Sequence, residues 1–232
     1  MGYDTTTMPQ GGCTREGVAG PLAGEMLVLQ WQAHPCWPVR HNAARALAAL
    51  RAGARGVLLA RAGRRRPHRH ERHALFPSDL SPASLDSLRL AIRSLPPMRF
   101  TLLHGCRVSG EGSMRAADVG EDTLDACRRR SEGAARAAGW RFAAQLRPCE
   151  VRPVLALLRQ PWHAAVAAHA AMARPDVLVL AEAGAGPFAA WRWRAQLRAL
   201  LARTECDLLL LPRPVPDDRP ARRGLGGALN VY

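Results

Sequence analysis

Two neighbouring stretches of the chain decide its fold: HALFPSDLSPASLDSLRLAI at residues 73–92 and RFTLLHG at residues 99–105. The opening apolar residues of the first stretch predict a short strand. Ser81 then caps a helix whose first position holds Pro82, where a missing N–H has no cost. Apolar side chains recur at helical spacing behind it, and the Pro-Pro pair at 96–97 ends the helix. The second stretch predicts another strand, so the order is strand, helix, strand.

The same alternation continues on both sides of these stretches. Short, continuously apolar strands separated by helices are typical of a parallel sheet with helices on both faces. We therefore expect an α/β fold with a five-stranded, Rossmann-like parallel sheet, whose ligands bind beyond the carboxyl ends of the strands. The remaining expected elements are strands at 26–29, 57–60, 151–158, 176–181 and 207–211; helices at 42–52 (capped by Asn42), at 122–146 and from Pro161; a helix with Trp193, Leu197, Leu200 and Leu201 on one face; and a glycine-rich loop at 105–121.

The positive charge of the chain comes entirely from arginine. The 232 residues include 33 basic and 19 acidic side chains, a formal net charge of +14, and no lysine, whereas isoleucine occurs once, at Ile92. This bias is typical of a GC-rich genome, so we interpret much of the charge as a solvated surface; the alternative is attraction to a polyanion such as nucleic acid. A hydrophobic share of 48% excludes wholesale disorder. No apolar run approaches the ~20 residues of a membrane span and the start lacks a signal-peptide pattern, so we expect a cytoplasmic protein.

Cysteine and histidine do not form a recognisable metal or redox motif. The six cysteines contain no Cys-x-x-Cys pair, and we interpret them as small apolar core residues. His68, His70 and His73 stand among arginines that would repel a cation. His163 and His169 are six residues apart on one expected helix and so diverge, and His104 closes an expected strand. We therefore expect no metal site and no catalytic centre.

The stretch from residue 73 onward resembles a universal stress protein domain. That family opens with a strand ending in a Pro-x-Asp-x-Ser turn, which stands here at residues 77–81, then a helix and a strand ending in Leu-Leu-His. Residues 175–180 resemble its fourth strand and residues 205–212 its fifth. The resemblance covers residues 72–212 and implies a bacterial, cytoplasmic stress-response protein.

The upstream part resembles the end of a second copy, with a fourth strand at Met26, the last helix at 42–52 and a fifth strand from Gly56. The chain thus resembles a tandem family member with a truncated first copy. In the family, domains pair through their fifth strands, which implies pairing of the segments that begin at Val57 and Leu208 (57–60 and 208–211), within the chain or in a homodimer. The expected division is loop or disorder at 1–23, the partial copy at 24–63, a basic linker at 64–72, the domain at 73–212 and a disordered tail at 213–232.

Many family members bind ATP through Gly-x2-Gly-x9-Gly-Ser after the fourth strand, because glycines let backbone N–H groups approach phosphates and the serine adds a donor. Those positions correspond here to Ala181, Gly184, Arg194 and Ala195, so one of the four residue types is kept. The upstream copy retains none of the three glycines. Three further residues match the family pattern and complete the vestigial site: Pro77, Asp79 and Gly105. Asp79 has an alternative, purely structural reading in the turn before Ser81.

The leading hypothesis from sequence is therefore a universal stress protein with a degraded ATP site and no cofactor, acting without catalysis through protein partners. The first alternative is an ATP-binding stress protein that uses Asp79, Gly184 and Arg194, with slow hydrolysis. The second is a basic nucleic-acid-binding module. Neither a recognition-helix motif nor a basic strand interleaved with aromatics supports the second alternative, so we expect neither nucleic acid nor a membrane as partner.

Overall fold

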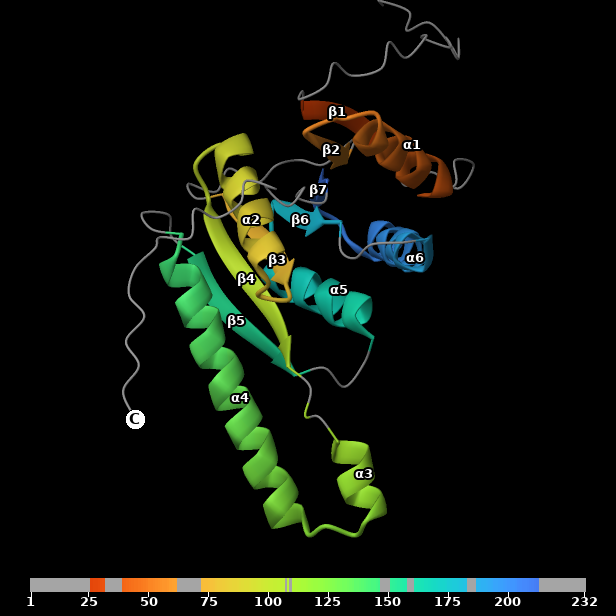
Figure 1. Ribbon diagram of the computed structural model, residues 1–232. Helices are drawn as coiled ribbons and strands as arrows, with labels where there is room; N and C mark the ends of the chain where they lie inside the picture. Colours follow the sequence, from red (N-terminus) through yellow and green to blue (C-terminus); the bar gives the residue numbers. More distant parts are fainter. Residues whose placement is uncertain are drawn as a thin grey trace, which may run out of the picture.

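The computed structural model describes residues 26–31, 39–61, 72–106, 108, 110–146, 151–157, 161–182 and 187–212. Figure 1 shows one mixed sheet with helices on either side. The expected disordered ends, the basic linker up to residue 71 and Gly184 lie outside the described residues. The elements are, in chain order, β1 (Met26–Trp31), α1 (Val39–Arg51), β2 (Gly56–Arg61), β3 (His73–Ser78), α2 (Pro82–Ser94), β4 (Arg99–Cys106), α3 (Glu111–Ala116), α4 (Glu121–Ala144), β5 (Val151–Leu157), α5 (Trp162–Ala173), β6 (Val177–Ala181), α6 (Pro187–Arg203) and β7 (Asp207–Leu211).

The sheet has seven strands in the order β1-β2-β7-β6-β3-β4-β5. The five strands from β3 onward are parallel, as the sequence predicted. The two N-terminal strands pair with each other in parallel and join the rest through an antiparallel contact between β2 and β7. That contact pairs Val57 with Leu210 and Leu59 with Leu208 within the chain, one of the two arrangements that the sequence left open for these segments.

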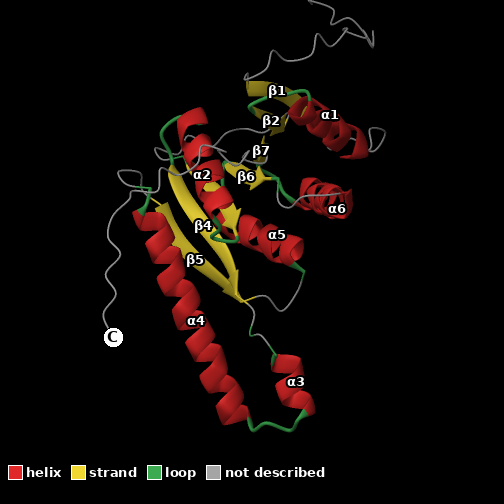
Figure 2. Ribbon diagram, viewed as in Figure 1, coloured by secondary structure: helices red, strands yellow, loops and turns green. Residues whose placement is uncertain are grey.

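Alternating side chains of the strands enter two cores, one on each face. On one face Leu75, Leu178 and Leu208 pack with α1, α5 and α6. On the other face Phe76 and Leu209 pack with α2 and α4. Figure 2 shows the same division, with α1, α5 and α6 on one side of the strands and α2 and α4 on the other. The predicted inner residues of α6 are confirmed: Trp193, Leu197, Leu200 and Leu201 are all buried.

Local signals around α2 act as predicted. The Ser81 side chain accepts a hydrogen bond from the Ser84 N–H at 3.2 Å, and Pro82 occupies the first turn. The helix ends at Ser94, immediately before the proline pair. Such a cap fixes the start of the helix relative to the end of β3, which is the part of the fold that positions the candidate site.

Three local expectations were wrong. Helix α1 begins at Val39, so Asn42 lies inside its first turn instead of capping it. The expected loop at 105–121 contains the short helix α3, and α4 already starts at Glu121. Strand β4 continues through Gly105 to Cys106, so this glycine lies within the strand and not after it.

Helices α3 and α4 extend beyond the carboxyl ends of β4 and β5, as Figure 1 shows. The two are joined by an ion pair between Glu111 and Arg128, with 2.6 Å between Oε1 and Nη2. Among the described residues, no helix combines the length and apolar character that crossing a membrane requires.

Candidate functional site

The carboxyl ends of β3, β4 and β6 form the candidate site. The chain leaves β3 in one direction for β4, and it later returns on the opposite side as β6, so the strand order reverses at this point. Residues His73 to Ser78 pair with β4 along the whole strand, whereas pairing with β6 covers only Ala74 and Leu75. The ladder between β3 and β6 therefore stops before their carboxyl ends, where ligands of such sheets usually bind.

The turn after β3 is held by its own side chains. Asp79 Oδ1 accepts hydrogen bonds from the Ser81 N–H at 2.9 Å and from the Ser84 hydroxyl at 2.5 Å. Ser78 Oγ accepts from the Leu80 N–H at 2.9 Å, and Leu80 takes the left-handed conformation with φ 62°. A carboxylate that closes a turn in this way performs the structural role that the sequence left open for Asp79.

The same contacts favour the ionised form of Asp79. Partial burial by itself would raise the pKa of this carboxyl group. Hydrogen bonds from Ser84 and from the Ser81 backbone and side chain oppose that effect, and the net pKa lies below its usual value. Asp79 is nevertheless exposed. At neutral pH it therefore places a negative charge at the edge of the site, which is unfavourable for a phosphate.

His104 ties β4 to the end of β3. Its Nδ1 lies 3.0 Å from the Ser78 carbonyl oxygen, directly across the β3–β4 register. A hydrogen bond at this distance requires that Nδ1 carries the proton, since a carbonyl oxygen only accepts. His104 thus fixes the end of β3, from a position two residues before the end of β4 instead of closing that strand as expected.

The structure places the remaining predicted residues in different surroundings. Pro77 lies in β3 opposite Leu103, and Ala181 closes β6 at the same end of the sheet. Gly105 pairs with Ala156 of β5, on the side of β4 away from β6. Pro77 and Ala181 therefore flank the reversal point, and Gly105 lies one strand further out.

Arg194 and Ala195 stand inside a helix, not at its start. Helix α6 begins at Pro187, which makes them its eighth and ninth residues. Only the first four N–H groups of a helix lack an intrahelical acceptor, so the N–H groups of both residues are used within α6. Arg194 is exposed, and its carbonyl oxygen accepts a hydrogen bond from Arg198 Nε at 3.3 Å. The two positions that would replace Gly-Ser thus present no free backbone donor to a phosphate.

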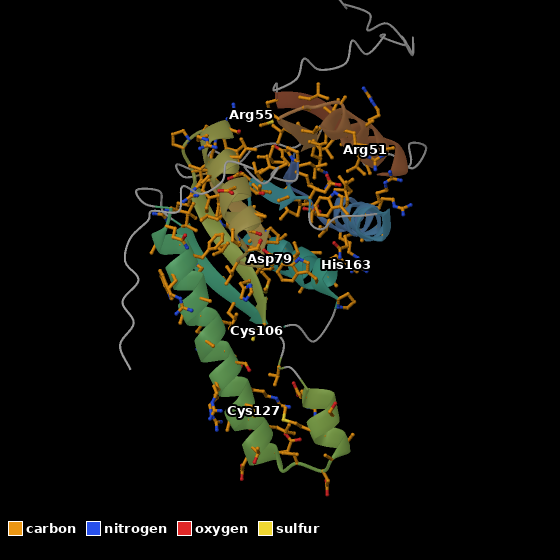
Figure 3. All side chains as sticks on the ribbon, in the orientation of Figure 1. Arg51, Arg55, Asp79, Cys106, Cys127 and His163 are labelled. Atoms are coloured by element: carbon orange, nitrogen blue, oxygen red, sulfur yellow. The ribbon has the colours of Figure 1, made fainter. Side chains whose placement is uncertain are left out.

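Within the described part of the chain, no group of three or more potential metal ligands comes together. Figure 3 labels Asp79, Cys106 and His163 near the carboxyl ends of the strands. Cys106 is buried, and burial followed by the charge of Glu132 raises the pKa of its thiol, so the nucleophilic thiolate is disfavoured.

Sequence reasoning missed Ser84 and the cross-strand role of His104. The signal for Ser84 was present, because it stands three residues after the cap Ser81, where a side chain reaches back to the turn. No local signal marks the bond from His104 to the Ser78 carbonyl, since it depends on the register of two strands 26 residues apart.

Comparison with known proteins finds likeness only at the level of structure. No family model matches the chain, and no curated protein does. Solved structures of universal stress proteins resemble it. A putative one from Pseudomonas aeruginosa has TM-score 0.46 and 14% identity, over 80% of this chain and 63% of that one. One from Archaeoglobus fulgidus has TM-score 0.44 and 11% identity, over 82% and 61%. A universal stress protein in complex with cAMP has TM-score 0.33 and 19% identity, over 60% and 95%. Because these identities and TM-scores are low, the function has to be inferred from the residues of this chain.

Proposed function

We propose that this chain is a universal stress protein whose nucleotide site no longer holds a triphosphate, and that it acts in the stress response through protein contacts, without catalysis. The observation that carries this proposal is the start of α6 at Pro187. The helix occupies the segment where the family resemblance requires an open phosphate loop. The N–H groups of Arg194 and Ala195 are therefore hydrogen-bonded within the helix.

The turn after β3 supports the same conclusion. Oδ1 of the Asp79 carboxylate accepts from Ser81 and Ser84, so this oxygen already serves the start of α2. What remains of the vestigial site thus contributes to the fold. A protein with this site would use its surfaces, rather than bound nucleotide, to engage partners.

The test is thermal unfolding of the full chain with and without millimolar Mg²⁺ and ATP, ADP, AMP or cAMP, together with analysis of nucleotide released on denaturation. A ligand at 100 times its Kd adds about 2.7 kcal/mol. For a protein of this size that raises the midpoint by roughly 5–10 °C. We expect no such rise and no released nucleotide, and either one would overturn the proposal.

A second candidate is an ATP-binding protein with an altered phosphate site. It is favoured by the position of Pro77, Asp79 and Ala181 around the point where the strand order reverses. If ATP does raise the midpoint, Arg194→Gln should abolish the rise. Arg203→Gln, which removes another exposed arginine of the same helix, should leave it intact. Equal loss in both variants would exclude Arg194 as a phosphate ligand.

A further inference from the structure

The outer surface of α4 gathers arginines around an exposed aromatic side chain. The inner surface of this helix packs on the sheet through Phe142 and Ala143. Five of the exposed side chains on its outer surface make up what we call the α4 arginine face: Arg129, Arg130, Arg136, Trp140 and Arg141. Trp140 is 60% exposed. Figure 3 marks the helix by Cys127 on its projecting half.

Helical geometry sorts these side chains into two rows. At 3.6 residues per turn, Arg129, Arg136 and Trp140 fall within about 40° of one another around the helix axis. Arg130 and Arg141 form a second row about 100° further round. Both rows extend over about 17 Å, at 1.5 Å per residue.

The strip of helix surface between the two rows carries small side chains. It holds Gly133 and Ala137, both exposed. A Cβ added at Gly133 would meet no atom within 4 Å. A chain-like ligand can therefore approach the helix backbone closely between two walls of guanidinium groups.

Most of the charge on this face is unneutralised. Arg136 forms an ion pair with Glu132, with 3.4 Å between Nη2 and Oε2. In the described part of the chain, the guanidinium groups of Arg129, Arg130 and Arg141 form no ion pair. Three free guanidinium groups around a small-residue strip make a surface complementary to a polyanion.

We propose that the α4 arginine face binds single-stranded nucleic acid, with phosphates on the arginines and a base stacked on Trp140. Exposed arginines and a flat aromatic ring are the two elements by which proteins hold single strands without reading their sequence. A duplex keeps its bases stacked on each other and leaves Trp140 without a partner, and an acidic peptide presents no base. Within each row the side chains stand 4 to 11 positions apart in the sequence and line up only when α4 is wound, so a search for a recognition motif does not reveal them.

The experiment measures fluorescence anisotropy of a labelled (dT)12 and of a 12-nucleotide single-stranded RNA with the full chain, from 25 to 300 mM salt. We expect a logarithmic salt slope near −2, about 0.7 for each of three neutralised phosphates. Trp140→Ala should weaken binding about 5- to 150-fold, the range for losing one base–aromatic stack, and Trp140→Phe should restore most of it. Arg129→Gln, Arg130→Gln and Arg141→Gln combined should flatten the salt slope.

The matched control combines Arg45→Gln, Arg51→Gln and Arg55→Gln, which removes the same charge from exposed arginines in and just after α1. Figure 3 labels Arg51 and Arg55 away from α4. Unchanged circular dichroism verifies folding of each variant. The proposal would be overturned by absence of binding at 25 mM salt, by equal loss of affinity in both triple variants, or by an unchanged affinity of Trp140→Ala. Equal affinity for a 12-base-pair duplex or for a poly-glutamate peptide would also overturn it.

Discussion

The antiparallel contact between β2 and β7 forms a seam that a buried carboxylate, that of Asp207, stabilises. Removal of this carboxylate should destabilise the whole molecule. The antiparallel ladder there is short, from Val57 to Leu59. Beyond it, Asp207 Oδ1 accepts the Arg61 N–H at 2.9 Å, and Arg61 Nη1 donates to the Thr204 carbonyl oxygen at 2.7 Å. Asp207 is 5% exposed, so water cannot readily replace its oxygen. Asp207→Ala therefore leaves a backbone donor at this seam without its acceptor.

The expected cost is about 1–3 kcal/mol, the penalty for an unsatisfied buried hydrogen-bonding group. For a domain of this size each kcal/mol lowers the unfolding midpoint by about 2–4 °C, so the shift should be about 2–12 °C. Asp207→Asn keeps an acceptor oxygen of the same shape and should lose less than Asp207→Ala.

Two measurements check this prediction: the free energy of unfolding in urea, and amide hydrogen exchange of Val57 and Leu59. In Asp207→Ala the β2 amides should exchange faster, because the seam opens more often. A loss below 0.5 kcal/mol, or unchanged protection of β2, would refute the idea that this carboxylate holds the N-terminal strands to the sheet.

Three further outcomes follow from individual side chains. Gly133→Ala should raise the free energy of unfolding by about 0.5–1 kcal/mol, whereas Gly139→Ala should give no gain, because its Cβ would lie 3.2 Å from the Cβ of a proline in β5; equal gains in urea unfolding would contradict this. Asp79→Asn should lower the free energy of unfolding at neutral pH and leave it unchanged in acid. The pKa of Asp79 is lower in the folded than in the unfolded protein, so its charge stabilises the fold at pH values above the unfolded-state pKa, and this contribution is lost as the pH falls through the folded-state pKa. A difference in stability that stays constant across a pH titration would be evidence against it. Arg128→Gln should speed hydrogen exchange in α3 with little change in the unfolding midpoint, since its partners Glu111 and Asp125 lie near the surface; unaltered exchange would show that other contacts dock α3.

Much of the five-stranded sheet was predictable because its signals are local. Ser81 and Pro82 mark the start of α2. The strand at Asp207 was placed correctly to the residue, since five consecutive buried positions leave little ambiguity. Prediction failed where a contact between separate parts of the chain determines whether an element forms. Helix α3 lies in a glycine-containing segment, and it is linked to the body by an ion pair from Glu111 to a residue 17 positions away.

The candidate site shows the same division. Alignment of Arg194 and Ala195 with a phosphate motif used sequence positions alone, and it could not reveal that α6 starts at Pro187. Whether a backbone N–H is free depends on where a helix begins, and helix boundaries depend on tertiary packing as much as on propensity.

The class of fold, the alternation of strands and helices, and the residues that face the core follow from local sequence patterns, because hydrophobic periodicity and capping signals lie in neighbouring positions. Tertiary contacts were needed for two other features. They joined β1 and β2 to the sheet through the ladder with β7 and the hydrogen bond from Arg61 to Asp207, and they placed His104 beside the Ser78 carbonyl oxygen. Both depend on strand register, which places residues distant in the chain beside one another in space.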